Sequence, residues 1–403
     1  MALAGRHIAI VGAGIGGLAA AAALGQRGAR VTVFEQAPAL AEVGAGIQIG
    51  PNGVSVLEAL GLRDAAERLA ELPDGVELVD GRSGRRVLRL ELGGACVRRY
   101  GRPYWQFHRA DLLALLEDGA REAGAEIRLG TRVGQIAGHG ASLLVVPEAR
   151  SVPEMTVDAV IAADGVRSPI RAERFATGPP RFTGHVAWRG LIDAAQLDPG
   201  LVPAGARVAM GPGRHLVLYP LRGGRLLNFV AVEERDEQPE EGWMQPDEPA
   251  RLRRAFAGWG GGVEEVLAKV ERTFLWGLYD HAPLPVWTKD RIGLLGDACH
   301  PMLPYLAQGA TMALEDAWVL GSELDVAPSL ERGLMAYEAR RAPRTARVQR
   351  AAARNGRIYH LGPGLRDMAN VALGIAGRVS PSGMLARFDW LYGADVVSAR
   401  STA

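Results

Sequence analysis

Three glycines near the N-terminus have the spacing of a phosphate-binding turn. Gly12, Gly14 and Gly17 stand in the order GxGxxG, directly after the apolar run Ile8–Val11 and before an alanine-rich segment. A strand, a tight turn and a helix in this order expose backbone N–H groups and the positive end of the helix dipole to a pyrophosphate. Glu35 ends the next expected strand about 20 residues farther on, where a carboxylate can accept both hydroxyls of a ribose. The pattern predicts a dinucleotide-binding site.

Taken alone, this pattern is weak, because a chain with 52 glycines produces GxGxxG by chance. Two other interpretations are a signal peptide over residues 8–24 and a solvated strand end at Glu35. However, the apolar run is interrupted by glycines, is too short to span a bilayer and is followed directly by a strand with its own acid. Dinucleotide binding is the favoured interpretation.

Two later apolar runs also end in a glycine and an acid. The first leads into Asp164 and Gly165, within the pattern D-G-x-x-S-x-x-R that ends at Arg171, and the second leads into Gly296 and Asp297. Near-continuous apolar runs are typical of strands buried on both faces of a parallel sheet. Such sheets bind ligands beyond the carboxyl ends of their strands. We expect these turns to converge on the ligand of the first turn.

Two expected helix starts can hold negative charge. Arg109 opens a helix that should run to about residue 123, and a guanidinium beside a helix N-terminus can bind phosphate, although a surface charge fits equally well. Gly309 and Ala310 open a second helix, expected over Thr311–Leu320. Its N-terminus can stabilise negative charge on a bound ligand.

A glycine-rich loop covers residues 43–53. A bulky planar ligand lying against the backbone would explain its glycines, and a surface loop fits nearly as well. These glycines are Gly44, Gly46, Gly50 and Gly53. Asn52 is expected to cap a helix at about Val54–Leu60.

His215 and Tyr219 lie in an expected strand of a region rich in aromatic and β-branched residues. The strand period places both on one face with Val217, and Leu216 and Leu218 on the other. His215 and Tyr219 are then roughly 13 Å apart at about 3.3 Å per residue, which would bracket one small aromatic molecule. A half-exposed sheet face with an ordinary His and Tyr is the simpler alternative.

Composition narrows the class of protein. A chain of 403 residues should divide into two parts, and its composition of 48% apolar and 23% charged residues favours a globular enzyme. The net charge of +1 gives no sign of an electrostatic surface for nucleic acid or an anionic membrane. The two cysteines are far apart, which favours a reducing, cytoplasmic location and no metal site. No long apolar stretch follows the first 30 residues, so we expect no membrane span.

The order of these elements resembles the single-component flavin-dependent aromatic hydroxylases with the p-hydroxybenzoate hydroxylase fold. The resemblance rests on the glycine turn with Glu35, Asp164–Arg171, Gly296–Pro301 and Gln308–Asp316, and it spans residues 8 to about 344. Within the family the chain looks most similar to salicylate hydroxylase, 3-hydroxybenzoate 6-hydroxylase and 6-hydroxynicotinate 3-monooxygenase.

The resemblance implies an α/β fold with an α+β second domain. A discontinuous Rossmann-like FAD-binding domain would comprise residues 1–75, 100–174 and 288–345. An antiparallel-sheet substrate domain would comprise residues 76–99, which look like a hairpin turning at Gly81–Gly84, and 175–287. Residues 346–403 would form a helical segment packed on the FAD domain, and the charges of the arginine-rich stretch from Leu334 to Arg354 should be solvated.

The resemblance also implies cofactor contacts. Asp164 and Arg171 would serve both FAD and the transient nicotinamide cofactor, and Gly309 and Ala310 would lie by the isoalloxazine. The full set implied is Gly12, Gly14, Ile15, Gly16, Gly17, Glu35, Gln36, Gly46, Gln48, Arg109, Asp164, Gly165, Arg171, Gly296, Asp297, Pro304, Gly309 and Ala310.

The implied reaction uses NADH or NADPH and O₂ to hydroxylate a small phenol or hydroxypyridine, with a carboxylate expected on the ring, through a flavin C4a-hydroperoxide. His215 is the expected base, since its ordinary pKa near 6.5 suits proton removal at neutral pH, and Tyr219 would position the ring. The candidates for holding substrate are Gln48, Arg189, Arg214 and Pro304. His300 could face substrate or merely cap its loop.

Other assignments stay open at this point. A larger natural-product substrate, a same-fold reductase and a non-enzymatic binder are alternatives. The chain could act as a monomer or a homodimer. The sequence leaves open the ring, the position hydroxylated, any loss of carboxylate, and the choice between NADH and NADPH.

Overall fold

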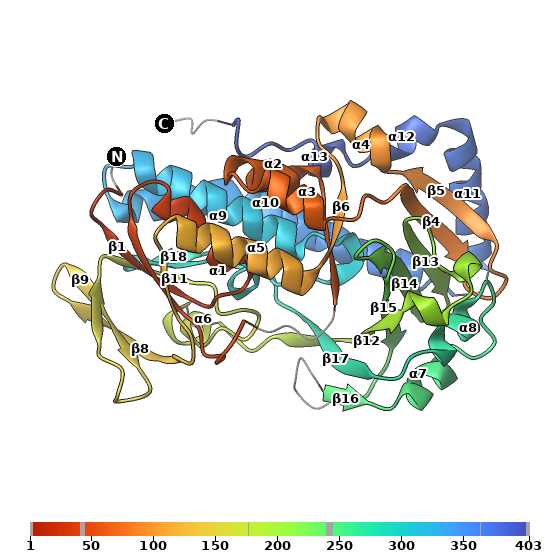
Figure 1. The fold of residues 1–403 in the computed structure, drawn as a ribbon, viewed down its shortest axis with the longest axis horizontal. Helices are drawn as coiled ribbons and strands as arrows, with labels where there is room; N and C mark the ends of the chain where they lie inside the picture. The colour runs from red at the N-terminus through yellow and green to blue at the C-terminus, as the bar shows by residue number, and fades with distance from the viewer. Residues whose placement is uncertain (1–2, 41–44, 176, 239–244, 363, 400–403) are drawn as a thin grey trace.

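The computed structural model describes residues 3–40, 45–175, 177–238, 245–362 and 364–399. Two sheets lie toward opposite ends of the molecule, with long helices running between them (Figure 1). The arrangement confirms the predicted α/β fold with a second, largely antiparallel sheet. Val43 and Gly44 of the predicted glycine-rich loop lie outside the described residues.

A six-stranded sheet carries the first glycine turn. Its strands lie in the order β18-β19-β11-β1-β2-β7, and every pair is parallel except β18 with β19. The carboxyl ends of β1, β11 and β19 therefore meet at one edge, as expected from the apolar runs. The strands are β1 (His7–Val11), β2 (Arg30–Phe34), β7 (Glu126–Arg128), β11 (Ala159–Ala162), β18 (Thr288–Lys289) and β19 (Ile292–Leu294).

Helices pack closely around this sheet. The alanine-rich α1 (Ile15–Gly25) is buried along nearly its whole length, because its small side chains let it contact both α5 (Arg109–Glu122) and α9 (Gly309–Val326). In turn, α9 packs against the long α10 (Leu330–Tyr359). Shorter helices nearby are α2 (Pro51–Ala59), α3 (Arg63–Leu69) and α6 (Pro169–Phe175).

An eight-stranded sheet forms the other end of the molecule. Its order is β16-β17-β12-β15-β14-β13-β4-β5, and only β13 and β4 pair in parallel. One face packs on α7 (Pro249–Ala255) and α8 (Val263–Ala268). The strands are β4 (Gly75–Asp80), β5 (Arg86–Glu91), β12 (Arg181–Asp193), β13 (Ala206–Gly211), β14 (Arg214–Leu221), β15 (Leu226–Glu234), β16 (Gln245–Asp247) and β17 (Thr273–Asp280).

The predicted hairpin over residues 76–99 is β4 and β5, which join the large sheet, and its end is a helix, α4 (Gly93–Tyr100). The division of the chain into domains stays a prediction. A two-stranded sheet pairs β3 (Gly46–Ile49) with β6 (Trp105–His108). A three-stranded sheet contains β8 (Val133–His139), β9 (Ser142–Pro147) and β10 (Met155–Val157).

The C-terminal part is helical, as expected. After α10 it contains α11 (Leu365–Val379), α12 (Pro381–Ala386) and α13 (Asp389–Tyr392), and α11 and α12 lie beside β5 (Figure 1). Within the described ranges, no helix combines the length and the apolar character that crossing a membrane requires.

Candidate cofactor and substrate site

A cavity of about 730 Å³ lies between the two sheets. One end is lined by the turns after β1, β11 and β19, and the other by the faces of β13, β14 and β15. The N-termini of α1 and α9 both open onto it, through Gly14–Gly16 and Gly309–Ala310. The cavity therefore joins the predicted dinucleotide turns to the predicted substrate face.

The first turn fits a pyrophosphate. Gly12 has φ +105°, and a side chain there would strike the carbonyl oxygen of Ala163, while a side chain at Gly17 would strike the carbonyl oxygen of Gly12. Nothing lies within 4 Å of the position where Gly14 would carry a side chain. Gly14 is also the N-cap of α1 and supplies no capping side chain. The helix N-terminus is thus open to a negatively charged group.

Glu35 is fixed beside this turn by backbone donors. Its carboxylate accepts hydrogen bonds from the N–H groups of Ala13 and Ala37, each at 2.8 Å. The two bonds leave further lone pairs on the carboxylate for a ribose. Gln36 follows on the exposed side.

Ile15 and Gly16 also line the cavity, and a side chain at Gly16 would meet Leu295 and Ala313. The helices α1 and α9 cross closely there. Gly165, Gly296 and Asp297 line the same wall. The sequence thus located all three turns correctly, because the carboxyl ends of neighbouring parallel strands share one edge.

Arg171 connects two of these turns. Its buried guanidinium donates to the carbonyl oxygens of Val166 (2.6 Å) and Ala298 (2.9 Å), and it lies 2.9 Å from Nε2 of His281. Burial raises the pKa of nearby Asp164. The predicted contact of Arg171 with FAD stays a prediction, but the side chain is engaged by the protein itself.

Asp297 contributes a carboxyl group to the cavity wall. Burial raises the pKa of its carboxyl, and the positive fields of His300 and Arg109 act against that shift. Arg109 lines the cavity at the start of α5, and its backbone N–H donates to Ala45 at 2.9 Å. The cavity wall thus carries both a carboxyl group, from Asp297, and a guanidinium, from Arg109.

A buried ionic network underlies the turn at Gly296. Arg341 donates to Glu315 (2.5 Å) and Asp316 (2.7 Å), and His300 Nε2 lies 2.5 Å from Asp316. Arg344 also donates to Glu315 at 2.7 Å. The prediction that the arginine-rich segment is solvated is therefore wrong for Arg341, which is 1% exposed.

Asn52 belongs to the same network, and the prediction that it caps a helix is wrong. The helix α2 starts at Pro51 with Gly50 as N-cap. The Asn52 side chain instead donates to Glu315 at 2.7 Å and to Gln308 at 3.2 Å. His300 likewise points to Asp316, in the interior.

The substrate face follows the predicted strand period. His215, Val217 and Tyr219 line the cavity, while Leu216 and Leu218 lie in the core on the other side of the sheet. Burial raises the pKa of Tyr219.

Two residues of β3, Gly46 and Gln48, also line the cavity. A side chain at Gly46 would strike the ring of Tyr219, and the N–H of Gly46 donates to Asn228 at 2.7 Å. Gln48 lines the cavity and accepts from the hydroxyl of Tyr104 at 2.6 Å.

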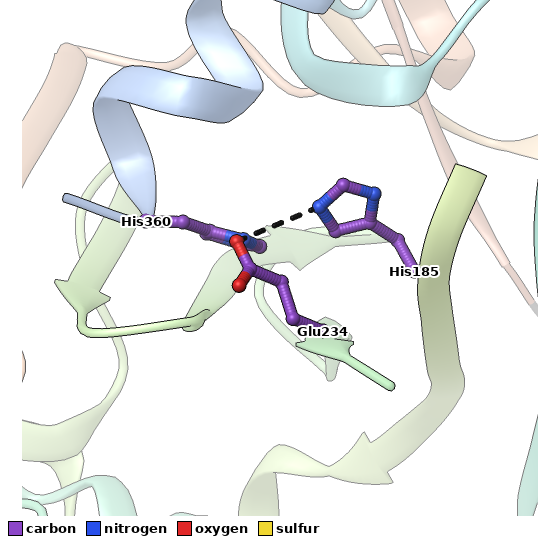
Figure 2. A group of neighbouring side chains, drawn as sticks. All are labelled: His185, Glu234 and His360. Atoms are coloured by element: carbon purple, nitrogen blue, oxygen red, sulfur yellow. Dashed lines mark hydrogen bonds and ion pairs between the residues drawn. The ribbon is translucent and has the colours of Figure 1, made fainter. Parts of the chain in front are cut away.

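His215 has a partner that sequence reasoning missed. Its Nδ1 lies 2.7 Å from Nε2 of His360, and Nδ1 of His360 lies 3.0 Å from Oε1 of Glu234. Figure 2 shows Glu234 beside the rings of His360 and His185. Burial lowers the pKa of His215 well below 6.5. Nothing in the sequence around His360, which directly follows α10, indicated this contact.

The predicted substrate residues separate into two groups. Gln48 and Pro304 line the cavity. Arg214 instead donates to Glu233 (3.0 Å) and to the carbonyl of Ala255 (2.7 Å), and Arg189 lies over the ring of Trp276, 4.8 Å from its centroid. Neither arginine is part of the cavity wall.

Two other arginines that were not predicted as site residues line the cavity. They are Arg354 and Arg387.

Two groups of side chains have the types that bind metals: His185, Glu234 and His360, and Cys299, His300 and Asp316. In both groups a histidine is already paired with a carboxylate. Nδ1 of His360 lies 3.0 Å from Oε1 of Glu234, and Nε2 of His300 lies 2.5 Å from Oδ2 of Asp316. We assign a metal to neither.

Comparison with known proteins agrees with this geometry. The family "FAD binding domain" matches residues 6–352. The chain is 36% identical over 409 residues to 3-amino-4-hydroxybenzoate 2-monooxygenase PtnB3 of Streptomyces platensis, covering 96% of each chain. It is 36% identical over 391 residues to 3-hydroxybenzoate 6-hydroxylase of Polaromonas naphthalenivorans, again covering 96% of each. The solved structure of Klebsiella pneumoniae HpxO with FAD and uric acid has a TM-score of 0.82 at 28% identity, over 96% of this chain and 97% of that chain.

Proposed function

The chain belongs to the FAD binding domain family, and on that basis we propose that it hydroxylates a small aromatic acid carrying a phenolic hydroxyl. It is an FAD-dependent aromatic monooxygenase that uses NAD(P)H and O₂, in line with its relatives. The relatives' names specify hydroxybenzoates, one of them amino-substituted. The observation that carries the proposal is the single cavity in which three glycine turns face His215 and Tyr219.

The residues at the first end of the cavity fit FAD. The open N-terminus of α1 and Glu35 would hold its ADP half, and Arg109 would contact the phosphates. Asp297 would bind the ribityl region, and the N-terminus of α9 would stabilise negative charge on the flavin ring. When bound, FAD supplies the redox chemistry by accepting a hydride from the nicotinamide and activating O₂.

At the other end, the chain's own residues prepare the ring for attack. His215 would remove the phenolic proton and so raise the nucleophilicity of the ring, and Tyr219 would orient it by a hydrogen bond. The apolar side chains of Val217, Val230 and Val232 line the same space and exclude water.

Arg354 would hold the substrate's carboxylate. Among the arginines of the cavity wall in the described chain, Arg109 would lie at the cofactor end. Arg354 lies on α10 next to Asn355, whose side chain donates to the backbone carbonyl oxygen of Tyr305 at 3.3 Å. A guanidinium is the usual partner of a benzoate carboxylate. Arg189 and Arg214, engaged outside the cavity wall, are weaker candidates.

We also propose that the protein is cytoplasmic, needs no nucleic acid or membrane partner, and acts as a monomer or homodimer. This proposal is supported by the net charge of +1, the two buried, unpaired cysteines and the nicotinamide requirement. Cell fractionation and sedimentation of the holoenzyme test these points.

The test is substrate-stimulated turnover of the yellow holoenzyme. NADH and NADPH oxidation would be followed with 3-amino-4-hydroxybenzoate, 3-hydroxybenzoate and 6-hydroxynicotinate, with mass spectrometry of the product and an assay for hydrogen peroxide. We expect a product one oxygen atom heavier, formed in step with NAD(P)H oxidation. Peroxide alone from every phenolic acid, or a protein that binds no flavin, would overturn the proposal.

A further inference from the structure

We propose that His215, His360 and Glu234 form a proton relay that carries the substrate's phenolic proton from the buried cavity to solvent. In this relay the Glu234 carboxylate fixes the tautomer in which His215 is a base toward the cavity. The inference rests on the proposed function and adds to it two residues that lie outside the cavity wall, His360 and Glu234. His215 would touch the substrate, and His360 and Glu234 would act through it.

Three elements bring the relay together. His215 lies on β14, Glu234 is the last residue of β15, and His360 directly follows α10. The separations are 2.7 Å from His215 Nδ1 to His360 Nε2, and 3.0 Å from His360 Nδ1 to Glu234 Oε1. Both are hydrogen-bond distances, so a proton can pass along the line without movement of the backbone.

The carboxylate determines where the protons lie. Glu234 can only accept, so Nδ1 of His360 carries the hydrogen and Nε2 of His360 is an acceptor. Nδ1 of His215 must then donate to that acceptor. The remaining ring nitrogen of His215, Nε2, is left without a hydrogen, and the residue lines the cavity. A distant, exposed carboxylate thus makes His215 a base.

Only the last group of the line reaches solvent. His215 is 2% exposed and the side chain of His360 is 2% exposed, whereas the side chain of Glu234 is 52% exposed. A proton taken up by His215 has no direct contact with solvent. Burial opposes a positive charge there and lowers the pKa of His215, and burial also lowers the pKa of His360 to about 4. Both rings therefore pass a proton on rather than store it.

The other titratable groups around the two rings do not compete for the proton. The rings of Tyr305 and Tyr359 contact His215, and burial raises the pKa of both phenols, that of Tyr359 to about 12. His185 packs beside His360, but its Nδ1 lies 3.2 Å from the Thr183 hydroxyl, and its Nε2 faces Glu234 at 3.7 Å. His185 therefore borders the outer end of the relay.

The step balances without a co-reactant. The substrate O–H bond breaks as an N–H bond forms at Nε2 of His215. The hydrogen at its Nδ1 moves to Nε2 of His360, and the hydrogen at Nδ1 of His360 moves to Glu234, which releases it to water. When the product oxygen is reprotonated, the same transfers run in reverse and restore both tautomers.

The test is ionisation of a bound phenol in the FAD-loaded enzyme without NAD(P)H. The probe is 3-amino-4-hydroxybenzoate. Its phenolate absorbance is followed by stopped flow across a range of pH, and its affinity is measured separately by flavin fluorescence. The variants are Glu234→Gln and His360→Ala, with Glu237→Gln as the matched exposed carboxylate.

We expect Glu234→Gln and His360→Ala to bind the probe with unchanged affinity but to ionise it at least about tenfold more slowly. This loss is part of the roughly 10²–10⁴-fold rate enhancement that general base catalysis supplies. Added imidazole should partly restore the rate in His360→Ala, which a merely structural role would not allow. Glu237→Gln should match the wild type.

Equal ionisation rates in Glu234→Gln and the wild type would overturn the relay, and so would a wild-type enzyme that binds the probe as the neutral phenol. In both cases hydroxylation by the wild type would leave the proposed function standing. A wild-type holoenzyme that neither binds nor hydroxylates any phenolic acid would instead overturn the proposed function and the relay with it.

Discussion

The ring of Tyr219 packs directly against the α-carbon of Gly46, on the strand next to the predicted flavin face. A glycine is needed there because a side chain would occupy the space of the ring. This contact links the two-stranded β3–β6 sheet to the face of the large sheet that carries His215 and Tyr219. In the proposed function, the position of the substrate ring would therefore depend on a backbone position in another sheet.

Gly46→Ala should weaken substrate binding by roughly tenfold, because Tyr219 must move to make room for the new methyl group. Overpacking of this kind costs about 1–3 kcal/mol of folding free energy. Flavin content should stay unchanged. Substrate affinity measured by flavin fluorescence checks the effect. Gly138→Ala is the control, since open space surrounds that position. Equal affinity in Gly46→Ala and the wild type would contradict the role of the contact.

His215→Asn should reduce coupled hydroxylation by roughly 10²–10⁴-fold while the protein keeps its FAD, because the base is lost and the flavin contacts lie at the other end of the cavity. Product formation per NAD(P)H consumed is the measurement, and the flavin spectrum is the control for folding. Unchanged coupled turnover would remove His215 from the mechanism.

The rate should depend little on pH near neutrality. Burial lowers the pKa of His215, and nearby His360 and His185 lower it further, so the neutral base is already the dominant form well below pH 6.5. As pH falls from about 8 to about 6, kcat/KM should therefore stay level, and it should decline only when the pH reaches the lowered pKa. The substrate's own titration in buffer is the control. An acidic limb centred near pH 6.5 would show that His215 is not buried in the working enzyme.

Arg341→Met should destabilise the protein by about 3–5 kcal/mol, because it removes the buried guanidinium that pairs with both Glu315 and Asp316. Thermal or urea unfolding of the holoenzyme measures the loss. Arg332→Met, at an exposed position of the same helix, is the control. A change below about 1 kcal/mol would mean that the network is not intact in solution.

The same network should make the fold sensitive to acid. Burial would raise the pKa values of Glu315 and Asp316, but nearby positive charges outweigh it, and both values are lowered. These charges are Arg341 and Arg344 at Glu315, and His300 and Arg341 at Asp316. A carboxyl with a lowered folded-state pKa contributes stability above its unfolded value, near 4, and loses it as pH falls toward the folded value. Circular dichroism below about pH 5 should show unfolding of the wild type and a weaker pH dependence in Arg341→Met.

The convergence of the three glycine turns could be predicted from sequence because its signals are local. Gly12, Asp164 and Gly296 each follow an apolar strand, and parallel pairing alone brings such strand ends to one edge. The face that carries His215 and Tyr219 follows from a period of two.

The rest depends on contacts between distant segments. Arg341 meets Asp316, and His360 meets His215 across 145 positions of sequence, and no periodicity marks either pair. The arginines of α10 looked solvated because charge runs usually are. Only the packing of α10 on α9 shows that Arg341 is the charge partner of a buried acid pair.

Arg354→Ala should raise KM for a carboxylated phenol by roughly 10–100-fold, since a hydrogen bond to a charged group contributes about 1.5–3 kcal/mol. The effect should vanish for the same phenol without its carboxylate, because the guanidinium then has no partner on the ring. Comparing 3-hydroxybenzoate with phenol in both proteins measures the difference, and Arg350→Ala, exposed one turn earlier on α10, is the control. An equal loss for both ligands would mean that Arg354 shapes the cavity rather than binding the carboxylate. In that case Arg387, which also lines the cavity, becomes the position to change.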